Sequence, residues 1–256
     1  MQKICGKKLH ILNWCRFLVR TFLFVGASTL YILGKANGWQ HSFGGIEFDK
    51  TVLMLIWIMF ALEFVAKLVP NKTESIGCHK QYSTFFEPTG KTKPKLLPWK
   101  KTLLVAVIWI VPNLVFGILY LTGIVDSGFL FLIVLFYAMG DLICVLFFCP
   151  FQVWFMQNRC CTNCRIYNWD MIFTFTPFVF IPHLYTYSLV FFGLVLLVWW
   201  EVVYHTHPER FSESTNKNLT CASCTEKTCQ HKKQLKNYVK KHANKFFAKG
   251  EDDETN

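Results

Sequence analysis

The feature that most constrains this chain is a series of long apolar runs. Each extends over about 18 to 24 residues with only one or two charges, which is the length that an α-helix needs to cross a bilayer. Backbone polar groups inside hydrocarbon must bond to one another, so we expect these runs to be helices. The sequence therefore predicts an all-α, multi-pass protein of the cell membrane whose helices are surrounded by the lipid bilayer. We expect six spans, at about 17–34, 51–69, 102–125, 128–149, 170–184 and 186–204.

The last apolar run, from Met171 to Tyr204, is too long for one crossing and slightly short for two. Pro177, Pro182 and His183 lie near its middle, where proline favours a break between two helices. We therefore expect the run to cross the membrane and return. The alternative is a half-buried 170–184 segment followed by one span, which would place the C-terminal tail on the opposite side.

The cations are unevenly distributed between the loops, and this predicts the orientation. A formal charge of +11 is also typical of nucleic-acid binding, but in a membrane protein the position of each Lys and Arg matters more, and we expect no nucleic-acid partner. Five cations precede residue 21, seven lie in 71–101 and ten follow Tyr204, whereas the 35–50 loop contains two. Cation-rich segments stay in the cytoplasm, so we expect both termini and the 71–101 loop there.

This orientation divides the chain into a transmembrane bundle, residues 1–204, and a cytoplasmic tail, residues 205–256, that is basic and rich in cysteine. Within the tail, residues 231–250 place apolar side chains along one helical face with lysines around it. That pattern predicts a helix lying on anionic lipid, although a solvated basic tail has the same composition.

Eleven cysteines are present, and the predicted topology places none in an outer loop. A disulfide framework belongs in an oxidising compartment, so metal binding or redox chemistry is the better interpretation of the clustered thiols. Two groups stand out, with C-x-x-C spacing that lets two thiolates converge on one ion. They are Cys160, Cys161 and Cys164, and then Cys221, Cys224 and Cys229.

The two groups are 56 residues apart, between Cys164 and Cys221, but a chain that crosses twice returns to the face it left. We therefore predict one shared metal site, with Cys78, His79, His205 and His207 as possible additional ligands. The remaining cysteines, Cys5, Cys15, Cys144 and Cys149, are interpreted as ordinary packing residues. Spacing does not separate an iron–sulfur cluster from zinc, because C-x-x-C serves both.

Ionisable side chains inside a span are costly and are functional candidates by default. Asp141 is the strongest, because it has no basic neighbour one helical turn away. Glu63 is expected to pair with Lys67, four residues on, and to lie at a similar depth to Asp141. Asn113 follows Pro112 in the third span, and His183 lies at the predicted turn.

Three functions fit these patterns. The first is electron transfer through a cysteine-ligated centre to or from a redox partner or a quinone in the membrane. The second is a transporter or sensor in which the cysteines hold a structural zinc and Asp141 and Glu63 line an ion or proton path. The third is thiol–disulfide exchange by Cys161 and Cys164. No nucleotide-binding or hydrolase motif is present in the sequence.

Overall fold

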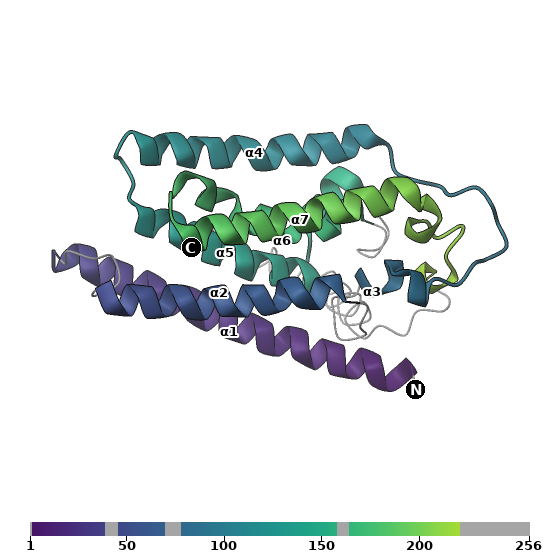
Figure 1. Cartoon of the computed structure of the whole chain (residues 1–256), viewed down its shortest axis with the longest axis horizontal. Helices are drawn as coiled ribbons and strands as arrows, with labels where there is room; N and C mark the ends of the chain where they lie inside the picture. The colour runs from purple at the N-terminus through teal and green to yellow at the C-terminus, as the bar shows by residue number, and fades with distance from the viewer. Residues whose placement is uncertain (1, 39–45, 70–77, 158–163, 221–256) are drawn as a thin grey trace, which may run out of the picture.

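The structure is a computed structural model that describes residues 2–38, 46–69, 78–157 and 164–220. Within those ranges its regular secondary structure is helical, apart from one isolated β-bridge between Pro88 and Asn216. The helices lie roughly along one direction and form an elongated bundle (Figure 1). Their bounds are α1 Gln2–Ala36, α2 Ile46–Leu68, α3 Cys78–Gln81, α4 Trp99–Leu121, α5 Ser127–Leu146, α6 Asp170–Phe175 and α7 Leu184–Thr206.

Four helices of the described part are long and apolar enough to cross a membrane. They are the His10–Ala36 part of α1, and α4, α5 and α7. Large apolar side chains remain exposed along them, such as Phe22 on α1 and Leu114 on α4. Exposed apolar faces on this scale are unfavourable in water and are compatible with a lipid environment.

The core lies where α1 packs against α5 and α2 packs against α7. Aromatic rings fill it: the Phe60 ring meets the Phe175 ring edge-on at 4.7 Å between centroids, and both side chains are fully buried. Edge-to-face pairs of this kind add about 0.5–1.5 kcal/mol beyond their buried area. The core therefore joins α2 to the short α6 segment.

The segment 165–183 runs antiparallel to α7. It consists of a 3-10 helix Arg165–Trp169, then α6, then a 3-10 helix Thr176–Phe180. Three contacts set the register: Arg165 bonds to Glu201, Ile172 lies against Gly193, and the Thr186 hydroxyl donates to the Ile181 carbonyl. The two segments thus run side by side for roughly 22 Å, from the α-helical rise of about 1.5 Å per residue.

Segment 165–183 and α7 together form a helical hairpin. The conformation of this segment differs from the one expected for the fifth span. Residues 170–184 do not form one continuous α-helix, because 3-10 turns flank α6 and the chain is extended at Ile181 and His183. The predicted break near Pro182 and His183 is confirmed, and the His183 ring nitrogen accepts from the backbone of Tyr185 as the N-cap of α7. The six-span count itself is not confirmed.

Other boundaries also differ from the prediction. The helix α4 ends at Leu121 rather than 125, and Gly123 with φ +76° follows it. The helix α5 ends at Leu146, before the expected 149, and a π-helical turn Phe151–Met156 follows Pro150. Proline tolerates the first turn of a helix but interrupts a longer one, which explains the break before residue 150.

The segment that follows α7 packs against the loop before α4. The Thr89 amide donates to the Thr215 carbonyl, and the Lys217 amide donates to Glu87. The Asn216 side chain, fully buried, donates to the Lys80 carbonyl at 3.1 Å. Residues 80–97 and 208–220 therefore lie at the same end of the bundle, on the right of Figure 1.

Candidate functional site

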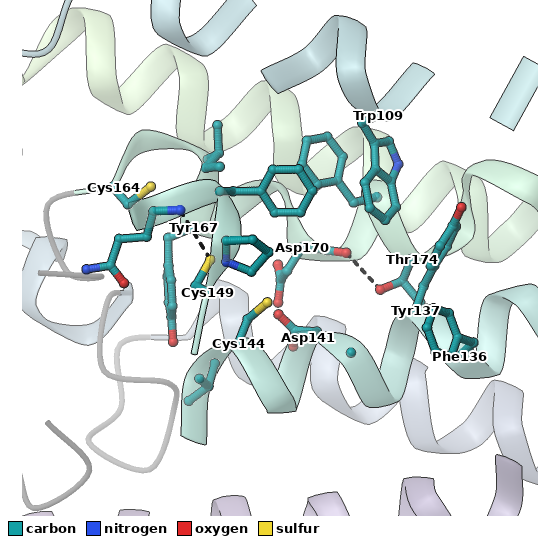
Figure 2. A pocket seen from close by; sticks show the side chains of 17 residues that line it. Trp109, Phe136, Tyr137, Asp141, Cys144, Cys149, Cys164, Tyr167, Asp170 and Thr174 are labelled. Atoms are coloured by element: carbon teal, nitrogen blue, oxygen red, sulfur yellow. Dashed lines mark hydrogen bonds between the residues drawn. The ribbon is translucent and has the colours of Figure 1, made fainter. Parts of the chain in front are cut away.

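A cavity of about 290 Å³ lies between α4, α5 and the chain that leads into α6. One part of its wall is aromatic, with Trp109, Phe136, Tyr137, Phe151 and Phe173. The other part carries the carboxyl groups of Asp141 and Asp170 and the thiols of Cys144, Cys149 and Cys164. Figure 2 shows the Asp141 and Asp170 carboxyl groups pointing toward one another, with the Cys144 thiol beside them.

The same two carboxyl groups also line a second, much smaller cavity of about 20 Å³. Asp141 and Asp170 thus separate the apolar cavity from a polar one. The small cavity is large enough for a single water molecule, which needs roughly 10–15 Å³. Its wall contains three cations and three carboxylates, namely Arg16, Arg20 and Lys67 with Glu63, Asp141 and Asp170.

Arg20 is the centre of this ionic network. Its guanidinium donates from Nη2 to both carboxylate oxygens of Glu63, at 2.6 Å each, and from Nη1 to the Ala138 carbonyl at 2.8 Å. The Asp141 Oδ2 atom lies 3.8 Å from Nη1. The guanidinium also lies over the Phe60 ring, 5.2 Å from its centroid. A planar guanidinium satisfies several acceptors at once, which suits a buried position better than lysine does.

The sequence positions these groups by helical spacing. Arg16 and Arg20 are four residues apart on α1, and Glu63 and Lys67 are four apart on α2, so each pair occupies one face. The Lys67 charge acts on the Glu63 carboxylate, as expected, and pairs between helices add to it. Arg20 holds the Glu63 carboxylate, while the Lys67 ammonium pairs with Asp170 at the start of α6.

The residues that follow Cys164 anchor the end of the bundle. Arg165 donates from Nε to Glu201 Oε1 at 3.1 Å, and Trp169 Nε1 donates to the same oxygen at 2.8 Å. Asn168 donates to Gln81, and Asp170 pairs with Lys67. The sequence CRIYNWD therefore connects α7, α3 and α2 through four polar anchors within six residues, with Cys164 itself buried.

Arg165 is held as a cation by its surroundings. The Glu201 carboxylate accepts hydrogen bonds from both Nε and Nη2 of Arg165 and balances its charge. The guanidinium lies 4.3 Å from the Tyr204 ring centroid, and its Nη2 atom is 3.3 Å from His205 Nε2. Arg165 and Glu201 therefore form a salt bridge that links the two helical segments of the hairpin.

A third cavity, of about 550 Å³, opens beside this link at the end of the bundle. Arg165, which directly follows Cys164, and Thr220, which directly precedes Cys221, both line it. The ends of the two cysteine-containing segments are thus brought to one place. Its other lining residues come from 95–97 and from 204–214.

The predicted metal ligands are only partly described. Cys160, Cys161, Cys221, Cys224 and Cys229 lie outside the described residues, and Cys78 and His79 belong to α3, where the backbone alone is described. His205 lies near Glu201 with an exposed side chain, and His207 Nδ1 is 3.2 Å from Glu209 Oε1. Within 2–38, 46–69, 78–157 and 164–220, no group of three or more His, Cys, Asp or Glu side chains is arranged to hold a metal ion.

The other polar candidates are distributed between separate places. Asn113 is buried on α4, and its amide donates to the Trp109 carbonyl at 2.8 Å. His183 caps α7 at the far end of the hairpin. Neither lies with Asp141 and Glu63, which share Arg20. Cys144 and Cys149, which the sequence did not distinguish, line the apolar cavity.

Sequence reasoning missed Arg20 and Asp170 as members of the ionic network around Glu63 and Asp141, and it missed the separate Arg165–Glu201 pair. A signal was present for Arg20, because a single arginine in an apolar run needs a buried partner. Comparison of the chain with protein-family models, with curated proteins and with solved structures gives no match, so its function is argued from these contacts alone.

Proposed function

We propose that the chain is a multi-pass protein of the cell membrane that carries a cysteine-ligated metal centre at its cytoplasmic end and takes part in electron transfer. The apolar helices α4, α5 and α7 support the membrane environment. The hairpin supplies one further segment, 165–183, which runs antiparallel to α7 for roughly 22 Å. That length is shorter than a hydrocarbon core of about 30 Å, so this segment would cross where the bilayer thins around it.

One observation carries the metal centre: Arg165 and Thr220 line the same cavity. Each is bonded in sequence to a cysteine of a different group, Cys164 and Cys221. Zinc and iron–sulfur centres both need four ligands within about 2.3 Å of a metal, so distant groups must meet. Cys161, Cys164, Cys221 and Cys224 are the proposed ligands, with Cys160 and Cys229 as substitutes.

An iron–sulfur cluster at this position would carry one electron at a time. Held by Cys161, Cys164, Cys221 and Cys224, such a cluster would supply one-electron transfer between a reduced protein on the cytoplasmic side and a quinone in the membrane. Two electrons and two protons convert both quinone carbonyls to hydroxyl groups, which gives a quinol. The electron-transfer partner is thus a soluble donor, and the acceptor is a lipid-soluble quinone.

The ionic network favours a second candidate function. Arg20 joins Glu63 to Asp141 inside the apolar bundle, and charged groups at such a depth often mark an ion or proton path. In this case the cysteines hold a structural zinc, and the chain is a transporter or sensor.

Metal analysis of the full-length protein, purified without oxygen, tests both candidates. Brown protein that absorbs near 400 nm and contains about four irons supports the cluster. Colourless protein with one zinc supports the second candidate, and a metal-free reducible pair selects thiol–disulfide exchange.

The matched variants are Cys161→Ser, Cys224→Ser and, as a control, Cys15→Ser, whose thiol is exposed on α1. Loss of metal in the first two but not in the control is the expected result. Equal metal content in all three variants would contradict a centre shared between the two cysteine groups.

A further inference from the structure

We propose that the apolar cavity between α4, α5 and α6 binds the ring of a quinol, and that a quinol hydroxyl donates a hydrogen bond to Asp141 or Asp170. This proposal rests on the proposed function, because it names where the quinone or quinol of that reaction would lie. The cavity, its aromatic wall and its carboxyl groups are the observations that carry it.

The aromatic wall suits a flat ring. Trp109 stacks on Phe173 at 4.7 Å between centroids with an interplanar angle of 18°, and its other neighbour Tyr137 is 4.4 Å away. These rings are already fixed by contacts with one another, so a ligand would meet a preformed surface. Apolar and aromatic walls with a few convergent polar groups are typical of small-molecule sites.

The polar part of the wall requires a ligand that donates a hydrogen bond. Asp170 Oδ1 is buried and has no hydrogen-bond partner, while Oδ2 pairs with Lys67. Asp141 makes only a 3.8 Å ion pair with Arg20 among its described contacts, and its side chain is 29% exposed because it borders the cavity. A buried acceptor without a donor is costly, and a bound hydroxyl would remove that cost.

Charge and size separate a quinol from other occupants. The carboxyl groups are balanced by Arg16, Arg20 and Lys67, so an added cation gains little. An acyl chain or an oxidised quinone offers no donor to a carboxylate. The volume of about 290 Å³ is at the lower end of the usual range for ligand sites, roughly 300–1,000 Å³, and suits one substituted ring.

The test uses durohydroquinone and duroquinone, whose rings are fully methylated and so resist addition of cysteine thiols. Binding to the full-length protein in lipid nanodiscs is measured anaerobically by titration calorimetry, with empty nanodiscs as the blank. We expect saturable binding of the quinol, at least 10-fold tighter than that of the quinone. Binding of neither, or equal binding of both, would overturn the proposal.

Gly140→Phe fills the cavity without disturbing the backbone. Gly140 lines the cavity, and a Cβ at this position meets no atom within 4 Å. Gly26→Phe is the matched control, because a Cβ there is equally unobstructed and Gly26 lies on α1, away from the cavity. We expect at least a 10-fold loss of quinol affinity in Gly140→Phe and no change in the control. Equal affinity in the two variants would place the quinol elsewhere.

Asp141→Leu tests the hydrogen bond. It keeps the size of the side chain approximately and removes the acceptor, so the preference for quinol over quinone should fall at least several-fold. Retention of the full preference would refute a role for Asp141 and leave Asp170, for which Asp170→Leu is the corresponding variant, because an asparagine would keep an acceptor oxygen. Metal content is measured on the same samples, so a missing cluster and a missing quinol site give separate results.

Discussion

At the scale of single residues, the structure depends most on Arg20. This guanidinium is 6% exposed, and it contacts Glu63, Asp141 and the Ala138 carbonyl from three different helical positions. A buried ion pair contributes little net stability compared with apolar residues, but removal of one partner leaves an uncompensated charge. Arg20 is therefore expected to be intolerant of substitution.

We predict that Arg20→Met lowers the free energy of unfolding by about 3–5 kcal/mol, because it strands the Glu63 carboxylate. Thermal unfolding in detergent would measure this. Arg16→Met is the control, since Arg16 Nε lies 3.9 Å from Glu63 and its side chain is 23% exposed. Similar losses in the two variants would show that Arg20 is not the principal counter-ion. In the double variant Arg20→Met with Glu63→Leu, much of the loss should be recovered.

Asp126 leads to a prediction on pH dependence. Its carboxylate caps α5 by accepting from the Phe129 amide at 2.9 Å, and it also accepts from the Tyr31 hydroxyl and pairs with Lys35. Burial opposes ionisation, but the bonds from Lys35, Phe129 and Tyr31 outweigh it and lower the pKa of Asp126. The Asp126 carboxylate therefore binds a proton more tightly in the unfolded chain than in the folded protein. Its contribution to the free energy of unfolding is complete above the ordinary pKa of about 3.9, and it is lost as the pH falls through the lower pKa of the folded protein.

Two variants separate the cap from the charge. Asp126→Asn keeps a good N-cap and should cost less than about 1 kcal/mol, because Lys35 is exposed. Asp126→Ala also loses the cap and should cost about 1 kcal/mol more. Melting temperatures measured from pH 6 to pH 3 should fall less steeply in both variants than in the wild type. An unchanged slope would mean that Asp126 does not contribute to the acid sensitivity.

At the scale of helices, the hairpin of 165–183 with α7 depends on close backbone approach. A Cβ on Gly193 would lie 3.0 Å from Ile172 Cα and 3.1 Å from its amide nitrogen, and both atoms belong to the backbone. The two segments must separate to accommodate any side chain at this position. Gly117 has a similar role, because the Phe180 ring occupies the space that a Cβ would need.

We expect Gly193→Ala to destabilise the protein by about 1–2 kcal/mol, since overpacking outweighs the gain in helix propensity. Gly26→Ala, with no atom near its Cβ, should be neutral or stabilise by up to about 1 kcal/mol. The comparison of their melting temperatures in detergent checks the prediction. If Gly193→Ala were as stable as Gly26→Ala, the close contact between α6 and α7 would be wrong.

Most of the helices were predictable from the sequence, because runs such as 128–149 and 186–204 are apolar over about the length that a helix needs to cross a bilayer. The hairpin break followed from Pro182 and His183. The short mixed helix 165–180 was not predictable, since its 3-10 turns depend on contacts with α7, such as Arg165 with Glu201. The local sequence pattern predicts that a helix forms, but it does not predict the tertiary contacts that determine where the helix ends.

The candidate site was predictable in part. The depth of Asp141 and Glu63 indicated a shared neighbourhood, but the sequence favoured Lys67 as the partner because it is close along the helix. The structure shows that Arg20 bonds directly to Glu63, although it is 43 residues away in the sequence and reaches Glu63 only through helix packing. A cavity depends on side chains from several elements, so no single motif could indicate that Cys144 and Cys149 line it.

At the scale of the whole molecule, the loop before α4 and the segment after α7 pack together at one end of the bundle. Residues 80–97 and 208–220 are connected there by backbone bonds, by the buried Asn216, and by Ser212, whose hydroxyl accepts from the Lys95 amide at 2.9 Å. The CRIYNWD sequence contributes at the same end through Asn168 and Gln81. Cys164, the basic loop from residue 80 to 97 and the chain from 208 to 220 therefore lie at one end of the bundle.

This arrangement predicts the membrane topology. If α1, α2, α4, α5 and the hairpin each cross the bilayer, the 86–98 loop and Asn256 lie on the same side, and the Asp126–Ser127 turn lies on the other. We expect a cytoplasm-active fluorescent reporter to be active when it is inserted after Gly90 or fused at Asn256. Gly90 is a suitable site, because it is exposed and no atom is within 4 Å of a Cβ placed there.

An export-dependent phosphatase reporter should give the opposite pattern, with activity only when it is inserted between Asp126 and Ser127. Expression levels of all fusions are compared by immunoblot, so that an inactive reporter is distinguished from an absent one. Opposite locations for Gly90 and Asn256 would require the 165–183 segment not to cross. The segments that carry Cys164 and Cys221 meet at the cavity lined by Arg165 and Thr220, so such a result would be incompatible with that cavity and with a shared metal site.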